Sequence, residues 1–167
     1  MSKGDKVLIE IKPCKVLRIV KIPEAMKTKL EFKEGGLLHP LIATYLVYSN
    51  IAKIVDESGK ELSLKEVINM FSDRNFWITF SVFLDLRKRG KKVEPGIEPN
   101  ELILESEKTK VYVFEENALV KARDLVSLVG RSMKQNYRVL IAVVDMYGDV
   151  TYYEVNKLAF SRIERRE

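Results

Sequence analysis

The sequence predicts an α+β fold in two parts, a small α/β N-terminal domain and a C-terminal mixed β-sheet flanked by helices. Three observations support this. Apolar runs with strand-like alternation open the chain, a strongly periodic helix follows over residues 76–89, and residues 138–155 have the pattern strand, turn, strand. With 167 residues and 46% hydrophobic content, the chain is long enough to bury a core.

Composition excludes several classes of protein. The one cysteine, Cys14, cannot form an internal disulfide, so we expect a reducing, cytoplasmic environment. No apolar run reaches the length of a membrane span and no signal peptide is visible, so we expect no membrane partner. A single histidine, His39, and a single cysteine exclude a His/Cys zinc site, and we expect no metal and no cofactor. The net charge of +5 permits a polyanionic partner without requiring one.

The N-terminal part begins with two predicted strands, residues 7–11 and 16–22, arranged as a hairpin. Residues 23–36 are rich in Lys and Glu and end in two glycines, which predicts a loop or linker. Pro40 suits the first turn of a helix, so His39 is expected to cap or pack there rather than to catalyse.

A third strand is predicted at residues 51–55, followed by a turn. Ser63 and Glu66 have the spacing of a capping box, which predicts a helix from there to Phe71. This helix closes the N-terminal domain, whose predicted limits are residues 1–72.

The C-terminal part, residues 73–167, opens with the helix over residues 76–89, which Gly90 ends. The basic run at residues 87–92 suits a helix C-terminus and equally suits phosphate contacts, so both interpretations stay open. The remaining pattern predicts strands at 101–105 and 110–114 and a helix at 118–134. It then predicts a strand at 138–145 that is buried on both faces and an edge strand at 150–155. The chain ends in a charged tail, in which Leu158, Phe160 and Ile163 are possible docking points.

Two motifs resemble the tRNA-splicing endonuclease family. The run Phe83-Leu-Asp-Leu-Arg-Lys-Arg-Gly90, with Val93 and Gly96, resembles the family signature around its D-L-R-x-R-G segment. The stretch from Leu140 to Val155, with its A-V-V-D and G-D-V-T-Y-Y segments, resembles the family's strand–loop–strand. The resemblance covers residues 37–155, leaves residues 1–36 outside, and implies a restriction-nuclease-like C-terminal sheet.

The resemblance implies metal-independent cleavage of precursor tRNA at bulge-helix-bulge sites, by attack of a 2′-hydroxyl on the adjacent phosphate. In this family a Tyr acts as general base, a His as general acid, and a Lys stabilises the charge that builds on phosphorus. The matching positions here hold Glu105 for Tyr, the region beginning at Ser106 for His, and Tyr137 or Arg138 for Lys. None of these positions has the residue type that the family's chemistry needs, so the chain itself is predicted to be catalytically inactive.

The resemblance therefore implies the structural subunit of an archaeal heterotetramer with two catalytic and two structural subunits. It assigns a subunit-docking loop, Asp145, Met146, Tyr147, Gly148 and Asp149, and a subunit-pairing strand with Val150, Tyr152, Tyr153 and Val155. An ordinary polar turn is the alternative for the loop. A stand-alone, homo-oligomeric RNA-binding module is the alternative for the whole chain, and a nuclease with unconventional residues is a third.

Overall fold

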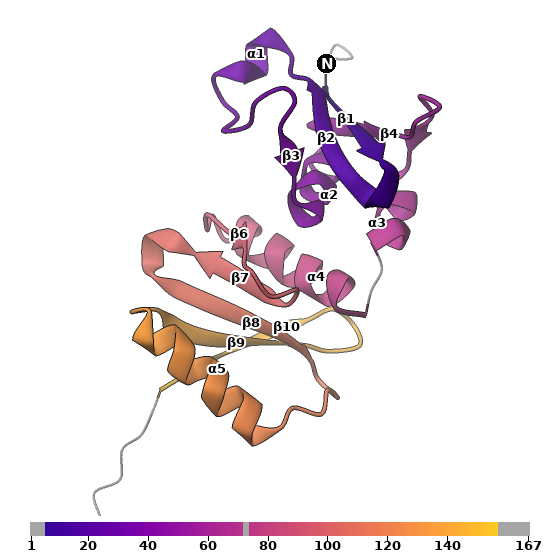
Figure 1. Cartoon of the computed structure of the whole chain (residues 1–167). Helices are drawn as coiled ribbons and strands as arrows, with labels where there is room; N and C mark the ends of the chain where they lie inside the picture. The colour runs from indigo at the N-terminus through magenta and orange to yellow at the C-terminus, as the bar shows by residue number, and fades with distance from the viewer. Residues whose placement is uncertain (1–5, 72–73, 157–167) are drawn as a thin grey trace, which may run out of the picture.

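The computed structural model describes residues 6–71 and 74–156, which form two mixed five-stranded sheets and five α-helices (Figure 1). This confirms the predicted α+β class. The boundary predicted at residues 72 and 73 and the docking points predicted in the tail lie outside the described residues. The division into two domains stays a prediction.

The first sheet has β1 at its centre, with the order β3-β2-β1-β4-β5. Strand β1 runs antiparallel to β2 and parallel to β4. Val7, Ile9 and Ile11 of β1 are buried, as the alternating pattern predicts. The strands are β1 Val7–Lys12, β2 Val16–Lys21, β3 Leu37–Leu38, β4 Ala52–Val55 and β5 Glu61–Leu62.

The segment predicted as a loop or linker, residues 23–36, is attached to this sheet. It contains one helical turn, α1 Glu24–Lys27, and its Met26, Leu30 and Phe32 pack against the core of the sheet. The amide of Gly35 also donates to the carbonyl of Ile19, at 2.8 Å. Apart from this turn the segment is a loop, one of the two predicted alternatives, and its irregularly spaced apolar side chains pack it against the sheet.

Two helices begin where their capping residues predict. Helix α2, Pro40–Tyr48, follows His39, whose Nδ1 accepts a hydrogen bond from the Leu41 amide at 3.2 Å. Helix α3, Leu64–Phe71, follows the capping box, in which Glu66 accepts from the Ser63 amide at 2.7 Å and the Ser63 hydroxyl accepts from the Glu66 amide at 3.3 Å. Hydrogen bonds from Ser63, joined by Lys60, lower the pKa of Glu66 to about 2. Both capping predictions are confirmed.

The second sheet has the order β10-β9-β8-β7-β6, with β8 and β9 parallel and the other pairs antiparallel. Helix α4 covers one face and α5 the opposite face (Figure 1). The elements are α4 Arg74–Lys88, β6 Glu94–Pro95, β7 Glu101–Leu104, β8 Thr109–Glu115, α5 Ala122–Lys134, β9 Arg138–Val144 and β10 Val150–Val155.

Two predictions in this part are wrong in detail. Helix α5 begins at Ala122 rather than Ala118, because Lys121 is extended and the Ala118 amide instead closes a turn onto the Glu115 carbonyl. Strand β9 is not buried on both faces along its whole length. Val139 is buried under α5, but Ile141 and Val143 on that face are only half-buried.

Helix α2 contributes to the cores of both sheets. Its Ala43 and Leu46 pack in the first core, whereas Leu41 belongs to the core between α4 and the second sheet. The rings of Tyr45 in α2 and Phe83 in α4 meet edge to face, with centroids 5.6 Å apart. In the part of the chain described, no helix is both long and apolar enough to cross a membrane.

Candidate functional site

Polar side chains gather at one end of the second sheet, where β7 ends and where β8 and β9 begin. The Tyr137 hydroxyl donates to Glu105 at 2.5 Å, and the Lys108 ammonium forms an ion pair with the same carboxylate. Lys108 and Lys110 lie over the Tyr137 ring, 5.4 and 5.3 Å from its centroid. Of the predicted site residues, Glu105 and Tyr137 are therefore brought into direct contact.

These contacts fix the protonation of the cluster. The hydrogen bond from Lys108, followed by that from Tyr137, lowers the pKa of the Glu105 carboxyl, so it is ionised at neutral pH. The bond to Glu105 raises the pKa of Tyr137. A phenol that donates to a carboxylate and whose pKa is raised is a poor general base.

A buried layer lies beneath this cluster and centres on Glu101. Its Oε1 accepts from Lys110 at 2.7 Å and from the Tyr112 hydroxyl at 3.2 Å, and that hydroxyl lies 2.9 Å from Ser132 Oγ in α5. Burial opposes the charge of Glu101, but the hydrogen bond and charge of Lys110 and the bonds from the Glu98 and Ile97 amides together outweigh it, so the pKa of Glu101 is lowered. Lys110 therefore supports both the buried layer and the Tyr137 ring above it.

The other residues predicted at the catalytic position point elsewhere. Arg138 lies on β9 and pairs with Glu154 on the neighbouring β10, with Nη2 2.8 Å from the carboxylate. Ser106 lies in the short 3-10 turn that links β7 to β8 and is exposed. The chain's single histidine, His39, caps α2 in the other part of the molecule.

The turn between β9 and β10 projects from the opposite end of the sheet. Asp145 Oδ1 accepts from the amides of Tyr147 and Asp149, at 2.8 and 2.9 Å, and Gly148 has a φ of +88° that favours glycine. Met146 and Tyr147 are almost fully exposed, and Asp149 is also exposed. Asp145 thus shapes the turn, while the other side chains of the turn face outward.

Strand β10 forms one edge of the second sheet and has two different faces. Val150 and Tyr152 point toward α4 and pack against its core. The Tyr152 hydroxyl donates to Asp85 Oδ2 at 2.7 Å, and Arg89 contacts the same oxygen at 2.7 Å. Tyr153 lies on the other face and is 55% exposed, and Val155 packs partly under α5.

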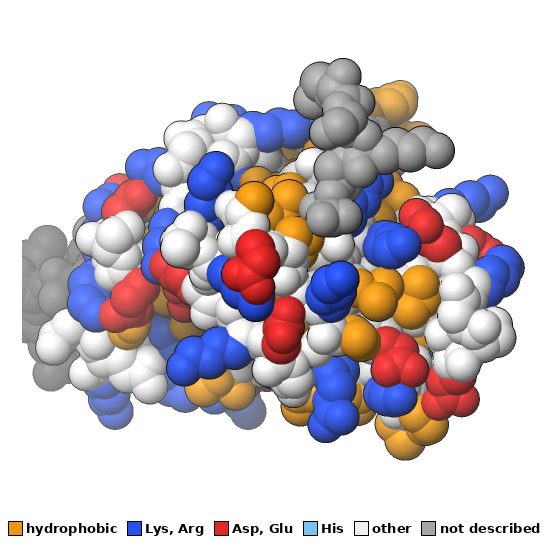
Figure 2. All heavy atoms as spheres, turned by 90° about the horizontal axis from the view of Figure 1, so that it is seen from above, with side chains coloured by type: hydrophobic (Ala, Val, Ile, Leu, Met, Phe, Trp, Pro, Cys, Tyr) orange, Lys and Arg blue, Asp and Glu red, His pale blue; other side chains and the backbone are white. Residues whose placement is uncertain are grey.

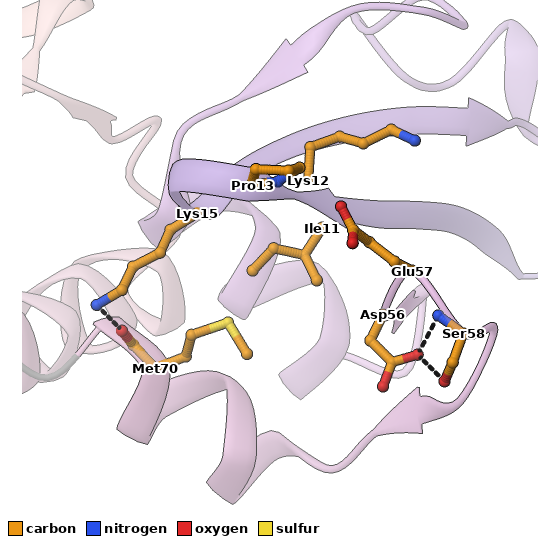
Figure 3. A pocket seen from close by; sticks show the side chains of 8 residues that line it. All are labelled: Ile11, Lys12, Pro13, Lys15, Asp56, Glu57, Ser58 and Met70. Carbon is orange, nitrogen blue, oxygen red and sulfur yellow. Dashed lines mark hydrogen bonds between the residues drawn. The ribbon is translucent and has the colours of Figure 1, made fainter.

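An open hollow of about 470 Å³ lies beside the first sheet, between the turn that joins β1 to β2, the turn that joins β4 to β5, and helix α3 (Figure 3). Three of its polar residues make contacts within the fold: Lys15 donates to the Met70 carbonyl at 2.6 Å, and Asp56 accepts from the amide and hydroxyl of Ser58. The hollow contains none of the predicted site residues.

Comparison with known proteins shows the family to which this chain is related. A tRNA-splicing endonuclease of Thermococcus gammatolerans is 30% identical over 137 residues, which cover 76% of this chain and 81% of the relative. The chain belongs to the tRNA-splicing endonuclease family. The Thermococcus kodakarensis endonuclease is 31% identical with the same coverage. The Methanococcoides burtonii endonuclease is 28% identical over 135 residues, and there the match spans 38% of the relative's length. No protein-family model matches the chain.

Three residues of the endonuclease signature make contacts inside this chain. Asp85 accepts hydrogen bonds from Tyr152 and Arg89, as described above. Arg87 donates to the Val93 carbonyl at 3.0 Å and lies over the rings of Tyr45 and Phe83. Arg87 and Arg89 of the basic run thus make contacts inside the chain, and both interpretations of the run stay predictions.

The sequence reasoning missed the buried layer under the catalytic position of the endonuclease family. The layer combines residues of three elements: Glu101 on β7, Lys110 and Tyr112 on β8, and Ser132 on α5. Ser132 follows Tyr112 by 20 positions in the sequence. A carboxylate at the start of an apolar strand was the one available signal, since a buried Glu needs a partner.

Proposed function

We propose that this chain is the structural, non-catalytic subunit of a tRNA-splicing endonuclease. It assembles with and positions a catalytic subunit, which cleaves precursor tRNA at bulge-helix-bulge sites without metal. The contact between Glu105 and Tyr137 is the observation that carries the proposal. These two residues stand at positions that match the family's catalytic residues, and a carboxylate bonded to a phenol with a raised pKa cannot replace the general acid and base of the reaction.

General acid catalysis is the part of the reaction that this chain lacks most clearly. Its single histidine is used as the cap of α2. Lys108 and Lys110 are cations near the catalytic position, but each is paired with a glutamate. A lysine held by a carboxylate offers little net charge to a phosphorane, so charge stabilisation is weakened as well.

The surfaces available for assembly support the same role. The turn 145–149 presents Met146, Tyr147 and Asp149 outward, and we assign it as the docking loop. Among the described residues, strand β10 has a neighbouring strand on one side only, so its outer backbone groups suit strand addition by a neighbouring subunit. We expect a complex of two catalytic and two structural subunits.

The test is a cleavage assay on a bulge-helix-bulge RNA without divalent metal. It uses this chain alone, the catalytic subunit of the same organism alone, and their mixture, with the stoichiometry read by native mass spectrometry. We expect cleavage in the mixture and none by this chain alone. Asp149→Lys should lower the activity of the mixture, whereas Glu57→Lys, an exposed carboxylate in the turn between β4 and β5, should not.

Cleavage by this chain alone would overturn the proposal and direct attention to Glu105, Tyr137 and Arg138. Tight RNA binding by this chain, unchanged by the catalytic subunit and without any cleavage by the mixture, would instead favour the stand-alone RNA-binding module. On the face shown in Figure 2, lysines and arginines are interspersed with acidic side chains rather than gathered into one stripe. That pattern gives little support to the stand-alone module.

A further inference from the structure

The most exposed apolar side chains of the described residues lie on three loops at one end of the second sheet. They are Leu119 at 103%, Ile97 at 92%, Met146 at 83% and Tyr147 at 82% of their full exposure. We call residues 96–100, 116–120 and 145–149 together the three-loop tip. Isolated exposed apolar residues are common on monomers, whereas several of them on adjoining loops are typical of an interaction surface.

Backbone hydrogen bonds hold the three loops beside one another. The Glu116 amide donates to the Val144 carbonyl at 2.9 Å, which places the loop after β8 next to the turn between β9 and β10. The Val113 amide donates to the Asn100 carbonyl at 2.9 Å, and the Asn100 side chain returns a bond to Val113 at 3.0 Å. The loop before β7 is thereby joined to the same end of β8 (Figure 1).

Two of the loops are shaped by buried or half-buried carboxylates. Glu101 Oε2 accepts from the amides of Ile97 and Glu98, at 3.0 and 3.2 Å, and Asp145 makes the matching contacts in the turn 145–149. The outward position of Ile97, Met146 and Tyr147 is therefore set by the backbone. A preformed apolar surface loses little conformational entropy when it binds.

The charge of the tip selects the kind of partner. Its three segments contain four carboxylates, Glu98, Glu116, Asp145 and Asp149, and no lysine or arginine, although the whole chain carries a net charge of +5. Glu116 and Asp149 form no ion pair with any residue in the described ranges 6–71 and 74–156. Such a surface repels RNA phosphates and anionic membranes and is complementary to a basic protein surface.

We propose that the three-loop tip is a single docking surface for the catalytic subunit, where it enters a cleft lined by apolar side chains and by Lys or Arg. Leu119 and Ile97 are its anchors beside the turn 145–149, and Glu116 and Glu98 add to the charge of Asp149. This inference rests on the proposed function and extends the docking element from one loop to three.

The test measures association of the full-length chain with the catalytic subunit of the same organism by isothermal titration calorimetry. Leu119→Ser and Ile97→Ser should each weaken the association about tenfold, because each removes a buried apolar anchor. Leu37→Ser is the matched control, since Leu37 is also exposed, at 68%, but lies on β3 of the first sheet. Glu116→Lys should weaken the association and reduce its dependence on salt. Thermal melts of all variants should match the unmodified chain.

Two results would overturn the inference, and they differ from each other. If Leu119→Ser and Ile97→Ser bind like Leu37→Ser while Asp149→Lys still weakens binding, then the turn 145–149 docks alone and the proposed function stands. If the unmodified chain neither binds the catalytic subunit nor restores cleavage, the proposed function fails and this inference fails with it.

Discussion

Gly96 lies directly against the side chain of Glu101, and this contact explains why the signature glycine is needed here. A Cβ placed on Gly96 would come within 2.4 Å of the Cγ of Glu101 and 2.7 Å of its Cβ and Cδ. Glu101 cannot swing away, because Lys110, Tyr112 and two backbone amides hold its carboxylate. The steric requirement at residue 96 thus follows from a buried charge at residue 101.

A pair of glycine substitutions tests this at the residue scale. Gly96→Ala should lower the free energy of unfolding by about 1–3 kcal/mol, since it overpacks a site that cannot relax. Gly130→Ala should raise it by up to about 1 kcal/mol, because Gly130 lies inside α5 with open space where its Cβ would go. Urea denaturation of both variants measures the two effects. A harmless Gly96→Ala would show that Glu101 is not held as described.

Strand β10 combines an internal and an external role on its alternating faces. Tyr152 is fastened to Asp85 and Arg89 of α4, and burial together with the bond to Asp85 raises the pKa of its hydroxyl far above the ordinary value. Tyr153 faces outward on the opposite side. Of the four residues predicted to pair with another subunit, Val150 and Tyr152 therefore hold the strand in place, and Tyr153 and Val155 remain on the side away from α4.

Two tyrosine substitutions separate these roles at the scale of the strand. Tyr152→Phe should cost about 1 kcal/mol of stability, because Asp85 loses one of its hydrogen bonds. Tyr153→Thr keeps a residue favoured in strands, so it should change stability by less than about 0.5 kcal/mol while weakening assembly with the catalytic subunit. Chemical denaturation and size-exclusion chromatography of the mixture give the two readouts. Equal loss of stability in both variants would contradict the division of faces.

Helix α2 joins the two sheets in the whole molecule. Leu41 is buried in the core of the second sheet, while the next turns of the same helix pack under the first sheet. The contact between Tyr45 and Phe83 and the position of Arg87 over both rings add to this junction. The two halves are therefore expected to unfold together.

The single tryptophan allows a test at this scale. Trp77 lies in α4, so its fluorescence reports the second half, whereas far-ultraviolet circular dichroism reports the whole chain. The two unfolding curves should coincide in the unmodified chain. Leu41→Ala should lower stability by about 2–5 kcal/mol and separate the curves, and Leu37→Ala, an exposed leucine nearby in sequence, should do neither. Separate curves in the unmodified chain would show that the halves are independent.

Local physics determined much of this protein from its sequence. Alternation placed β1 and β2, the capping box placed the start of α3, and the turn residues placed the reversal between β9 and β10, since each depends on neighbours within a few residues. The composition likewise shows that His39 is the one histidine in the sequence.

Only the tertiary structure decided what depends on residues far apart in the chain. It attached residues 23–36 to the first sheet, turned Tyr152 inward and Tyr153 outward, and brought Glu105 to Tyr137 across 32 residues of sequence. It also assembled Ile97, Leu119 and Met146 at one end of a sheet. These arrangements are set by strand order and helix placement, because loops that are distant in sequence become neighbours once the sheet has formed.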